Sequence, residues 1–211
     1  SDNLESFYQM EVEELRTLAK EQAESNKEFT LSESENGYQL KFTDGVLEFF
    51  AIHNTEVNPV VIKQTRIKLN KFYRDRVKKV IIGKGIAEIS DFAFDDYKNL
   101  ETIIISEDVC KISSTSFTGR EDGNSWGCPN LSSFAVNENN KYYKSVGGVL
   151  YTFDMQTIVT YPPAKPELYY EIASNVKNIG THAFKRAKNL QCLKVGENCD
   201  TIGDFAFLNA F

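Results

Sequence analysis

The segments Ile89–Phe94 (ISDFAF), Ile112–Phe117 (ISSTSF), Ile179–Phe184 (IGTHAF) and Ile202–Phe207 (IGDFAF) decide the fold of this chain. The first two begin 23 residues apart, and so do the last two. The gap between the second and the third is 67 residues, two short of three such periods, so it can hold two irregular units. A fixed period in the twenties indicates a solenoid of small stacked units. Such a fold has one continuous core and open faces that suit binding better than chemistry.

Each regular unit also carries a strand-like phrase with apolar residues at its first, fourth and sixth positions. The four phrases are Val77/Val80/Ile82, Leu100/Ile103/Ile105, Leu131/Phe134/Val136 and Leu190/Leu193/Val195. This pattern predicts one parallel strand per unit on one face, with short helical or 3₁₀ turns on the other. A small residue before each closing phenylalanine predicts that successive units approach closely there. These residues are Ala93, Ser116, Ala183 and Ala206.

Two departures interrupt the repeats. The segment Thr118–Gly127 holds an eight-residue insertion, judged against the first unit, and it contains the only tryptophan, Trp126. The second departure is Asn137–Tyr161, in which Gly147-Gly148 joins two strand-like runs and predicts an extra β-hairpin.

Residues 1–75 have a different pattern. Residues 3–27 carry an apolar stripe at helical spacing behind a capping pair, Asp2 and Glu5, which predicts an amphipathic helix packed on its own domain. Alternating apolar residues around Asn36-Gly37 and Asp44-Gly45 then predict an antiparallel meander, with a further strand around residues 60–69. The predicted class is therefore α+β: a helix and small antiparallel sheet in residues 1–75, followed by a short solenoid in residues 76–211.

Composition excludes several classes of function. Of the net charge of −6, residues 1–75 carry −5, and no basic domain predicts nucleic-acid binding. One basic stretch precedes the repeats and reads either as a solvated junction or as a patch for an anionic partner. It comprises Arg66, Lys68, Lys71, Arg74, Arg76, Lys78 and Lys79. No apolar run is long enough to span a bilayer, and the first residues show no signal peptide.

The run Ile-x-x-x-Ala-Phe-x-x-x-x-x-Leu-x-x-Ile-x-Ile resembles the BspA-like class of leucine-rich repeats, over residues 77–211. The segment from Tyr143 to Pro162 is similar to the hairpin-bearing unit of that family. The resemblance implies a curved solenoid and a microbial cell-surface or secreted protein that binds host or matrix proteins. It implies no catalytic residue. The chain departs from the family at Tyr97 and Ala187, where many members have cysteine.

No motif predicts a catalytic site, a cofactor or a metal. Cys128 and Cys199 fall in packing slots of the repeat, whereas Cys110 and Cys192 lie on different faces of different units, and spacing alone cannot pair the four. His182 occupies a variable slot, and the pattern favours a structural role for both histidines. An enzyme remains the least favoured alternative, with His53 and either Glu48 or Glu56 as its acid–base pair.

The strand phrases predict where a protein partner would bind. Residues between the inward apolar positions face the open sheet, and tryptophan on a polar insertion favours a contact role. The candidate residues are Lys79, Ile81, Thr102, Ile104, Trp126, Ser133, Ala135 and Lys194, with Cys192 on the same stripe. Two other interpretations stay open: sheet-compatible residues without a ligand, and a tryptophan folded back on its loop. The leading function is a non-enzymatic adhesion-type protein, and the alternative is a scaffold that self-associates through the C-terminal repeat edge, unless Phe211 covers that edge.

Overall fold

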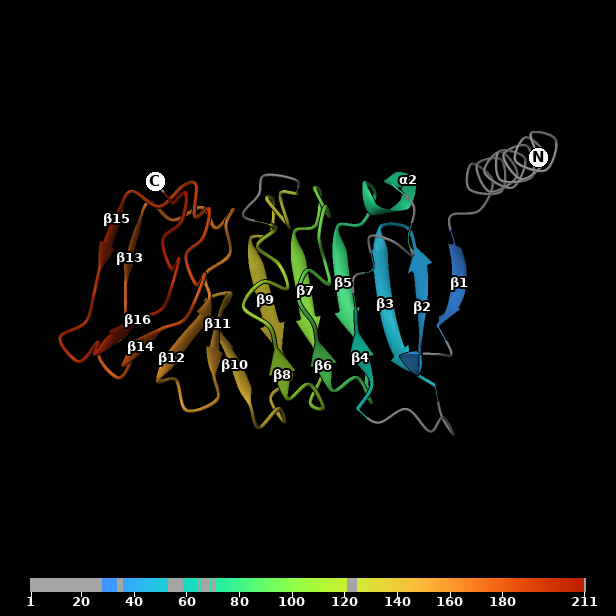
Figure 1. Cartoon of the computed structure of the whole chain (residues 1–211), viewed down its shortest axis with the longest axis horizontal. Helices are drawn as coiled ribbons and strands as arrows, with labels where there is room; N and C mark the ends of the chain where they lie inside the picture. The colour runs from blue at the N-terminus through green and yellow to red at the C-terminus, as the bar shows by residue number, and fades with distance from the viewer. Residues whose placement is uncertain are drawn as a thin grey trace, which may run out of the picture.

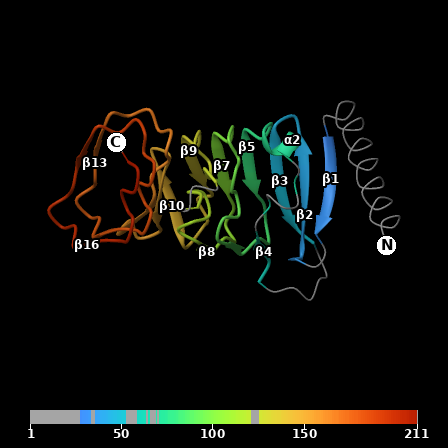
Figure 2. The same cartoon turned by 45° about the horizontal axis from the view of Figure 1, so that its top comes forward.

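The computed structural model describes residues 28–33, 36–52, 59–63, 65, 69, 71–120 and 125–210. The helix predicted over residues 3–27 lies outside these residues, as do His53, Glu56 and Phe211. The described chain is mostly strand, and its one helix is the four-residue α2 (Lys71–Arg74). Figure 1 shows the strands side by side in one elongated row, and Figure 2 shows the same order from another angle.

A six-stranded sheet runs through the first half, in the order β1-β2-β3-β5-β7-β9. Its strands are β1 (Glu28–Glu33), β2 (Tyr38–Thr43), β3 (Val46–Ala51), β5 (Lys79–Ile82), β7 (Thr102–Ile105) and β9 (Ser133–Val136). The first three pair antiparallel, as the Asn36-Gly37 and Asp44-Gly45 turns predict, and from β3 onward each pair is parallel. The predicted meander and the strand-per-unit sheet are therefore one continuous sheet.

A second series of short strands lines the opposite side of each coil. In the first half these are β4 (Val61–Ile62), β6 (Glu88–Ile89) and β8 (Lys111–Ile112), paired parallel. Within the described part of residues 60–69, the expected strand covers only Val61–Ile62, and it belongs to this second sheet. Apart from α2, which lies between β4 and β5, the described segments between the two sheets are turns, so the predicted helical or 3₁₀ pieces do not form at the repeat phrases.

The second half repeats this plan with different sheets. Strands β13 (Tyr169–Glu171) and β15 (Cys192–Lys194) pair on one side. The other side carries a five-stranded sheet, β10-β11-β12-β14-β16. Its strands are β10 (Tyr143–Val146), β11 (Val149–Thr152), β12 (Thr157–Thr160), β14 (Asn178–Ile179) and β16 (Thr201–Ile202). Strands β10 and β11 form the predicted hairpin at Gly147-Gly148, where both glycines have positive φ.

The 23-residue period of the sequence is the spacing of contacts between coils. The rings of Phe94 and Phe117 stack with centroids 5.8 Å apart, and those of Phe184 and Phe207 lie 5.4 Å apart. Tyr161 takes the place of the phenylalanine one period before Phe184, with ring centroids 5.0 Å apart. The period of the last coils therefore extends back to Tyr161, in the segment that follows the hairpin, although no phenylalanine marks it there.

Backbone bonds explain the small residue before each closing aromatic ring. The amide of Phe94 donates to the Ser116 carbonyl at 3.1 Å, and the amide of Tyr161 donates to the Ala183 carbonyl at 2.7 Å. Coils bonded this closely leave no room for a long side chain. All four small residues are at most 2% exposed, which confirms the predicted close approach.

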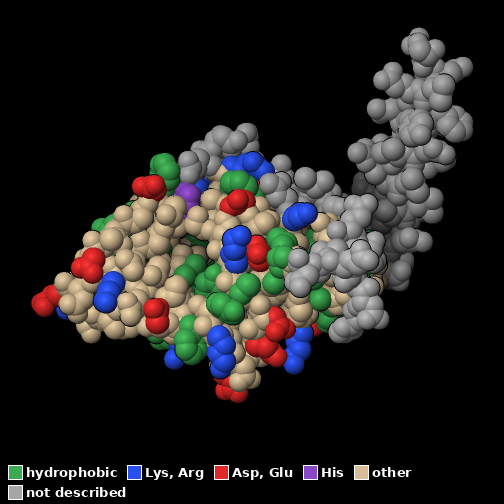
Figure 3. Space-filling view, turned by 60° about the horizontal axis from the view of Figure 1, so that its bottom comes forward, with side chains coloured by type: hydrophobic (Ala, Val, Ile, Leu, Met, Phe, Trp, Pro, Cys, Tyr) green, Lys and Arg blue, Asp and Glu red, His purple; other side chains and the backbone are tan. Residues whose placement is uncertain are grey.

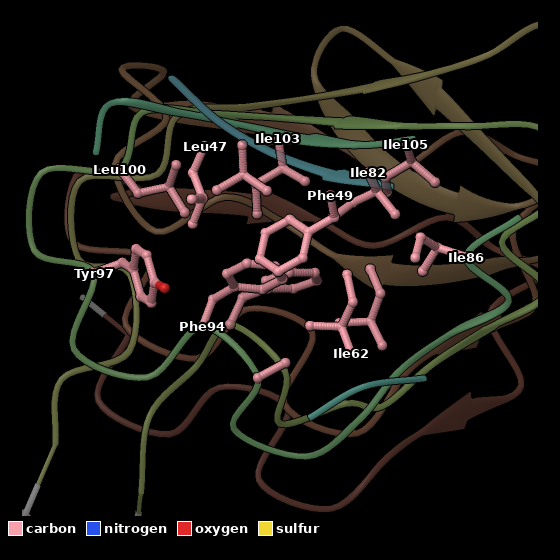
Figure 4. Close-up of a cluster of buried hydrophobic side chains, with 14 of the residues drawn as sticks. Leu47, Phe49, Ile62, Ile82, Ile86, Phe94, Tyr97, Leu100, Ile103 and Ile105 are labelled. Carbon is pink, nitrogen blue, oxygen red and sulfur yellow. The ribbon is translucent and has the colours of Figure 1, made fainter. Parts of the chain in front are cut away.

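The core of the first half contains the inward residues of both sheets and the aromatic rings between them (Figure 4). Phe49 from the meander packs edge-on against Phe94 of the first repeat, with ring centroids 5.7 Å apart. The core and the large sheet thus cross the boundary predicted between residues 75 and 76, and the division into two domains stays a prediction. The hydrophobic residues of the last described coil are less buried than those of the other coils. Leu193 is half-buried, and Val195 and Ile202 are exposed.

The buried side chain of Asn140 fixes the start of the hairpin. Its Nδ2 donates to the carbonyls of Ser106 and Val109 at 2.8 and 2.9 Å. Its Oδ1 accepts from the amides of Tyr142 and Tyr143, both at 2.8 Å. One amide group therefore satisfies four backbone groups where the regular coil ends and the hairpin begins.

We expect Asn140→Ala to lower the free energy of unfolding by about 2–3 kcal/mol, because it leaves buried backbone donors and acceptors without partners. The measurement is chemical denaturation of both proteins at neutral pH. The control is Asn139→Ala, since Asn139 is an exposed neighbour. Equal stability of the two variants would show that the Asn140 bonds do not hold the hairpin.

Candidate partner-binding surface

Six of the eight predicted contact residues lie together on the outward face of the large sheet. Inward residues alternate with outward ones along each strand, so Val80 and Ile82 are buried while their neighbours point out. Parallel register aligns the outward residues in two rows across β5, β7 and β9. One row is Lys79–Thr102–Ser133 and the other is Ile81–Ile104–Ala135.

This face changes in character along the sheet. The second row is apolar, with Ile81 and Ile104 half-buried and Ala135 exposed. On the side of the meander, register adds Val46 beside Lys79 and Glu48 beside Ile81. Glu48 is predicted from the sequence only as part of a possible acid–base pair, and Val46 is not predicted as a contact residue, because the pairing of β3 with β5 has no local signal. The second row is therefore a short apolar strip that ends beside the carboxylate of Glu48 on β3.

The remaining two candidates lie elsewhere. Lys194 is on β15, outside the large sheet, and its Nζ pairs with Glu171 Oε1 at 2.7 Å. This partner lies one 23-residue period earlier, so the pair joins two neighbouring coils. Trp126 lies on the insertion and is 59% exposed, the largest value among the exposed large hydrophobic residues described. Figure 3 shows that hydrophobic side chains on the face it presents gather near its middle, with charged side chains around them.

Two glycines form the rigid neck of the insertion that presents Trp126. Gly119 and Gly127 both have positive φ, 70° and 62°. A Cβ added at either residue would lie within 2.5 Å of the other's backbone nitrogen, so only glycine fits. The amide of Cys128 closes the neck by donating to the Phe117 carbonyl at 2.9 Å.

Arg186 supports the tryptophan ring from the following half of the solenoid. Its guanidinium carbon lies 4.9 Å from the ring centroid, and its Nη1 donates to the Ser125 carbonyl at 3.3 Å. Burial lowers the pKa of Arg186, and the nearby Asp95 carboxylate opposes that shift. The ring is therefore stacked on Arg186 but remains exposed, as a cation–π pair at a protein surface allows.

The basic stretch before the repeats does not form one free patch within the described chain. Arg74 is buried and its Nη1 donates to the Leu69 carbonyl at 2.6 Å. The Arg76 guanidinium lies over the Phe72 ring, and Lys71 pairs with Asp75. Lys78 and Lys79 are exposed, whereas Arg66 and Lys68 lie outside the described residues.

Cys128 and His182, two side chains that could carry chemistry, serve packing in this structure. Cys128 is fully buried, its Sγ lies 3.1 Å from the Phe94 carbonyl, and burial raises the pKa of its thiol. Cys199 is half-buried, since it belongs to the last described coil, and all four cysteines are free. His182 is 6% exposed and its ring stacks on Phe205. No group of three or more metal-binding side chains occurs among the described residues.

Asparagines ahead of the strand phrases tie neighbouring coils together. Asn99 Nδ2 donates to the Asp75 carbonyl, 24 residues earlier, and Asn189 Nδ2 to the Lys165 carbonyl at the same spacing. Asn130 Nδ2 donates to the Lys98 carbonyl, 32 residues earlier, which confirms the eight-residue insertion. This ladder of bonds was not predicted from the sequence, although each asparagine directly precedes the first leucine of a strand phrase.

The aspartate of the first repeat phrase bonds to the next coil. The Asp91 carboxylate accepts a bond from the Thr115 hydroxyl at 2.6 Å and another from the Ser113 hydroxyl. These hydroxyl bonds lower the pKa of Asp91. The charged form therefore holds two coils together.

The chain belongs to the BspA-type leucine-rich repeat family. The model of the family, described as the BspA type leucine rich repeat region, matches residues 65–145 and 168–210 in six copies. No curated protein matches the chain. No helix in the described part of the chain has the length and apolar character that crossing a membrane requires.

Solved structures similar to the chain are bacterial. One is a leucine-rich repeat protein from Eubacterium ventriosum, with 22% identity, a TM-score of 0.39, and coverage of 87% of this chain and 64% of that one. Another is the pneumococcal vaccine antigen PcpA, with 16% identity, a TM-score of 0.40 and coverages of 87% and 68%. A leucine rich cell surface protein from Faecalibacterium prausnitzii has 14% identity, a TM-score of 0.37 and coverages of 89% and 76%. The chain thus spans less than two thirds of the first of these proteins.

We expect the stability that Asp91 contributes to depend on pH. Its folded-state pKa lies below the unfolded value of about 3.9, so the contribution is present above that value and disappears as the pH falls through the folded one. Asp91→Asn should therefore be less stable than the wild type at pH 7, and the difference should shrink towards pH 3. Urea unfolding at both pH values measures this.

The matched control is Asp204→Asn, at the same position of the last repeat phrase. Within the described chain no hydroxyl group bonds to the Asp204 carboxylate. The two variants should differ at pH 7. A loss for Asp91→Asn that is equal at both pH values would contradict the role of the ionised carboxylate.

Proposed function

We propose that this chain is a non-enzymatic, protein-binding repeat protein that acts in adhesion, at a microbial cell surface or after secretion. Membership of the BspA-type repeat family supports the class, because its members are typically non-enzymatic repeat proteins of this kind. The surface location and the host or matrix partner come from the family resemblance. The observation that carries the site is the pair of outward rows on β5, β7 and β9.

The face has the chemistry of a protein contact. Short side chains let a partner approach the sheet closely, and the apolar row Ile81–Ile104–Ala135 offers area that a partner can remove from water. Burial of such area supplies about 25 cal/mol per Å². Lys79 lies at the start of the polar row, where a charge guides orientation more than it adds affinity. Trp126 is a separate candidate anchor, because exposed tryptophans held rigidly are typical centres of binding energy.

The test measures binding of the full chain to a panel of purified extracellular-matrix proteins by surface plasmon resonance. We expect at least one saturable interaction, weakened about 10-fold or more by Ile104→Lys, which is worth about 1.4 kcal/mol. Trp126→Ala should weaken it if the insertion is part of the same contact. Tyr142→Ala is the control, since Tyr142 is 54% exposed on the hairpin and outside the candidate set.

Two results would overturn this function. One is a panel without any saturable partner, and the other is binding by both Ile104→Lys and Trp126→Ala that equals that of the wild type. A loss of binding confined to Tyr142→Ala would move the contact to the hairpin.

A scaffold that self-associates through the repeat edge is the second candidate. It is favoured by the apolar residues of the last described coil, where Ile202 is 58% and Phe205 is 54% exposed. Sedimentation velocity separates the two functions: a monomer at all concentrations excludes self-association. The absence of a catalytic site and of a cofactor stays a prediction. The alternative of an enzyme built around His53 also stays a prediction, since His53 and Glu56 lie outside the described residues.

A further inference from the structure

The hydrophobic interior consists of two separate clusters. The first extends from Tyr38 to Phe134 and includes Leu150, and the half-buried Val159 of β12 packs against it. The second begins at Val149 and extends to Ala206. The aromatic rows follow the same division, because Phe94, Phe117 and Phe134 contact one another, and Tyr161 begins a new row with Phe184. No ring contact joins the two rows among the described residues.

Strand β11 is the wall between these clusters. Successive side chains of a strand point to opposite faces. Leu150 accordingly belongs to the first cluster, while Val149 and Tyr151 belong to the second. The sheets are also interrupted at this point: β9 is the last strand of the six-stranded sheet, and β13 is the first strand of the two-stranded sheet.

On the side of the coils where the turns lie, the side-chain hydrogen bonds between the two halves come from charged residues. Lys185 is 2% exposed, and its Nζ donates to the Gly119 carbonyl at 3.0 Å, 66 residues earlier. Arg186 Nη1 donates to the Ser125 carbonyl at 3.3 Å, and Lys188 Nζ to Asn130 Oδ1 at 3.1 Å. All three cations belong to the second half, and they bind the insertion or the turn that follows it.

The first half contributes a buried charge to the same region. Asp95 is 2% exposed, and its Oδ2 lies 3.5 Å from Nε of Arg120 at the insertion. Two buried hydroxyl groups near the wall, those of Thr118 and Tyr161, have no hydrogen-bond partner among the described protein atoms. Burial of charges and hydroxyls is unfavourable unless they are hydrogen-bonded, so specific polar bonds hold this region together with the apolar contact of Val159.

We propose that the solenoid consists of two cooperative halves that meet at a polar seam, and that the described neck of the insertion, residues 118–120 and 125–127, is the strap that fixes their relative orientation, because Lys185 and Arg186 clamp it. The two halves are residues 28–136 and 157–210, with the hairpin between them. The hairpin unit takes the place of a regular coil in the sheet, but it supplies no turn segment on the opposite side of the solenoid. The insertion therefore makes the contact between the halves on that side. Trp126 is exposed because the strap lies on the surface of the seam.

The chain itself offers the labelling sites for a test. Cys110 of the first half and Cys192 of the second are exposed, whereas Cys128 is buried with a raised thiol pKa and would not react. In a Cys199→Ser background, spin labels on Cys110 and Cys192 report the distance between the halves by pulsed electron paramagnetic resonance. We expect one narrow distance distribution in this parent protein.

The variant Lys185→Met/Arg186→Met keeps an unbranched apolar side chain at both positions and removes both bonds to the insertion. It should broaden the distance distribution or add a second population. Amide hydrogen exchange should stay slow within β5 and β7 and within β12 and β14. The matched control is Lys194→Met, because Lys194 pairs with Glu171 inside the second half, and its distribution should remain that of the parent.

Two results would overturn the strap. An unchanged, narrow distribution in the double variant would show that the insertion does not set the orientation. Loss of amide protection in both halves together would show that the solenoid is one cooperative unit without a seam. Hydrogen exchange also separates this inference from the proposed function, because it does not depend on any binding partner.

Discussion

The structure depends on the contact between each coil and the coil 23 residues further along the chain. Rings of closing aromatic residues stack at this spacing, and backbone amides bond to the carbonyl of the small residue in the next coil. Neither interaction is strong alone, but both join the coil of Phe94 to that of Phe117, the coil of Tyr161 to that of Phe184, and the coil of Phe184 to that of Phe207. A single coil in isolation would expose its apolar face to water, so the units are stable only as a stack. Side-chain bonds such as those of Asp91, Asn99 and Asn189 then hold the register.

The same constraint explains how the chain tolerates its irregular units. The hairpin unit lacks the phenylalanine phrase, but Tyr161 keeps the ring position and Asn140 satisfies the backbone where the regular coil ends. The insertion is longer than a normal turn, and it contacts the second half across the seam. Function follows from the parts that the stacking does not use: the outward side chains of the large sheet, the exposed Trp126, and the apolar edge of the last described coil.

Much of this could be predicted from the sequence, because the decisive signals are periodic or local. The repeat period, the hairpin at Gly147-Gly148, the meander turns and the packing slot of Cys128 depend on spacing and turn chemistry. The outward rows followed from strand alternation alone. The seam could not be predicted, since Lys185 and Gly119 are 66 residues apart and Lys185 has no distinguishing neighbour in the sequence. The continuity of the meander with the repeat sheet was missed for the same reason: pairing of β3 with β5 is a long-range contact.

The most direct test of this account is a double-mutant cycle on Phe94 and Phe117, whose stacked rings lie one period apart in the first core. Unfolding free energies of the wild type, Phe94→Leu, Phe117→Leu and the double variant give the coupling between the two rings. The account predicts a favourable coupling of about 0.5–1.5 kcal/mol, as expected for aromatic rings in contact. Additive losses with no coupling would contradict it, because residues 23 apart would then not share one stack.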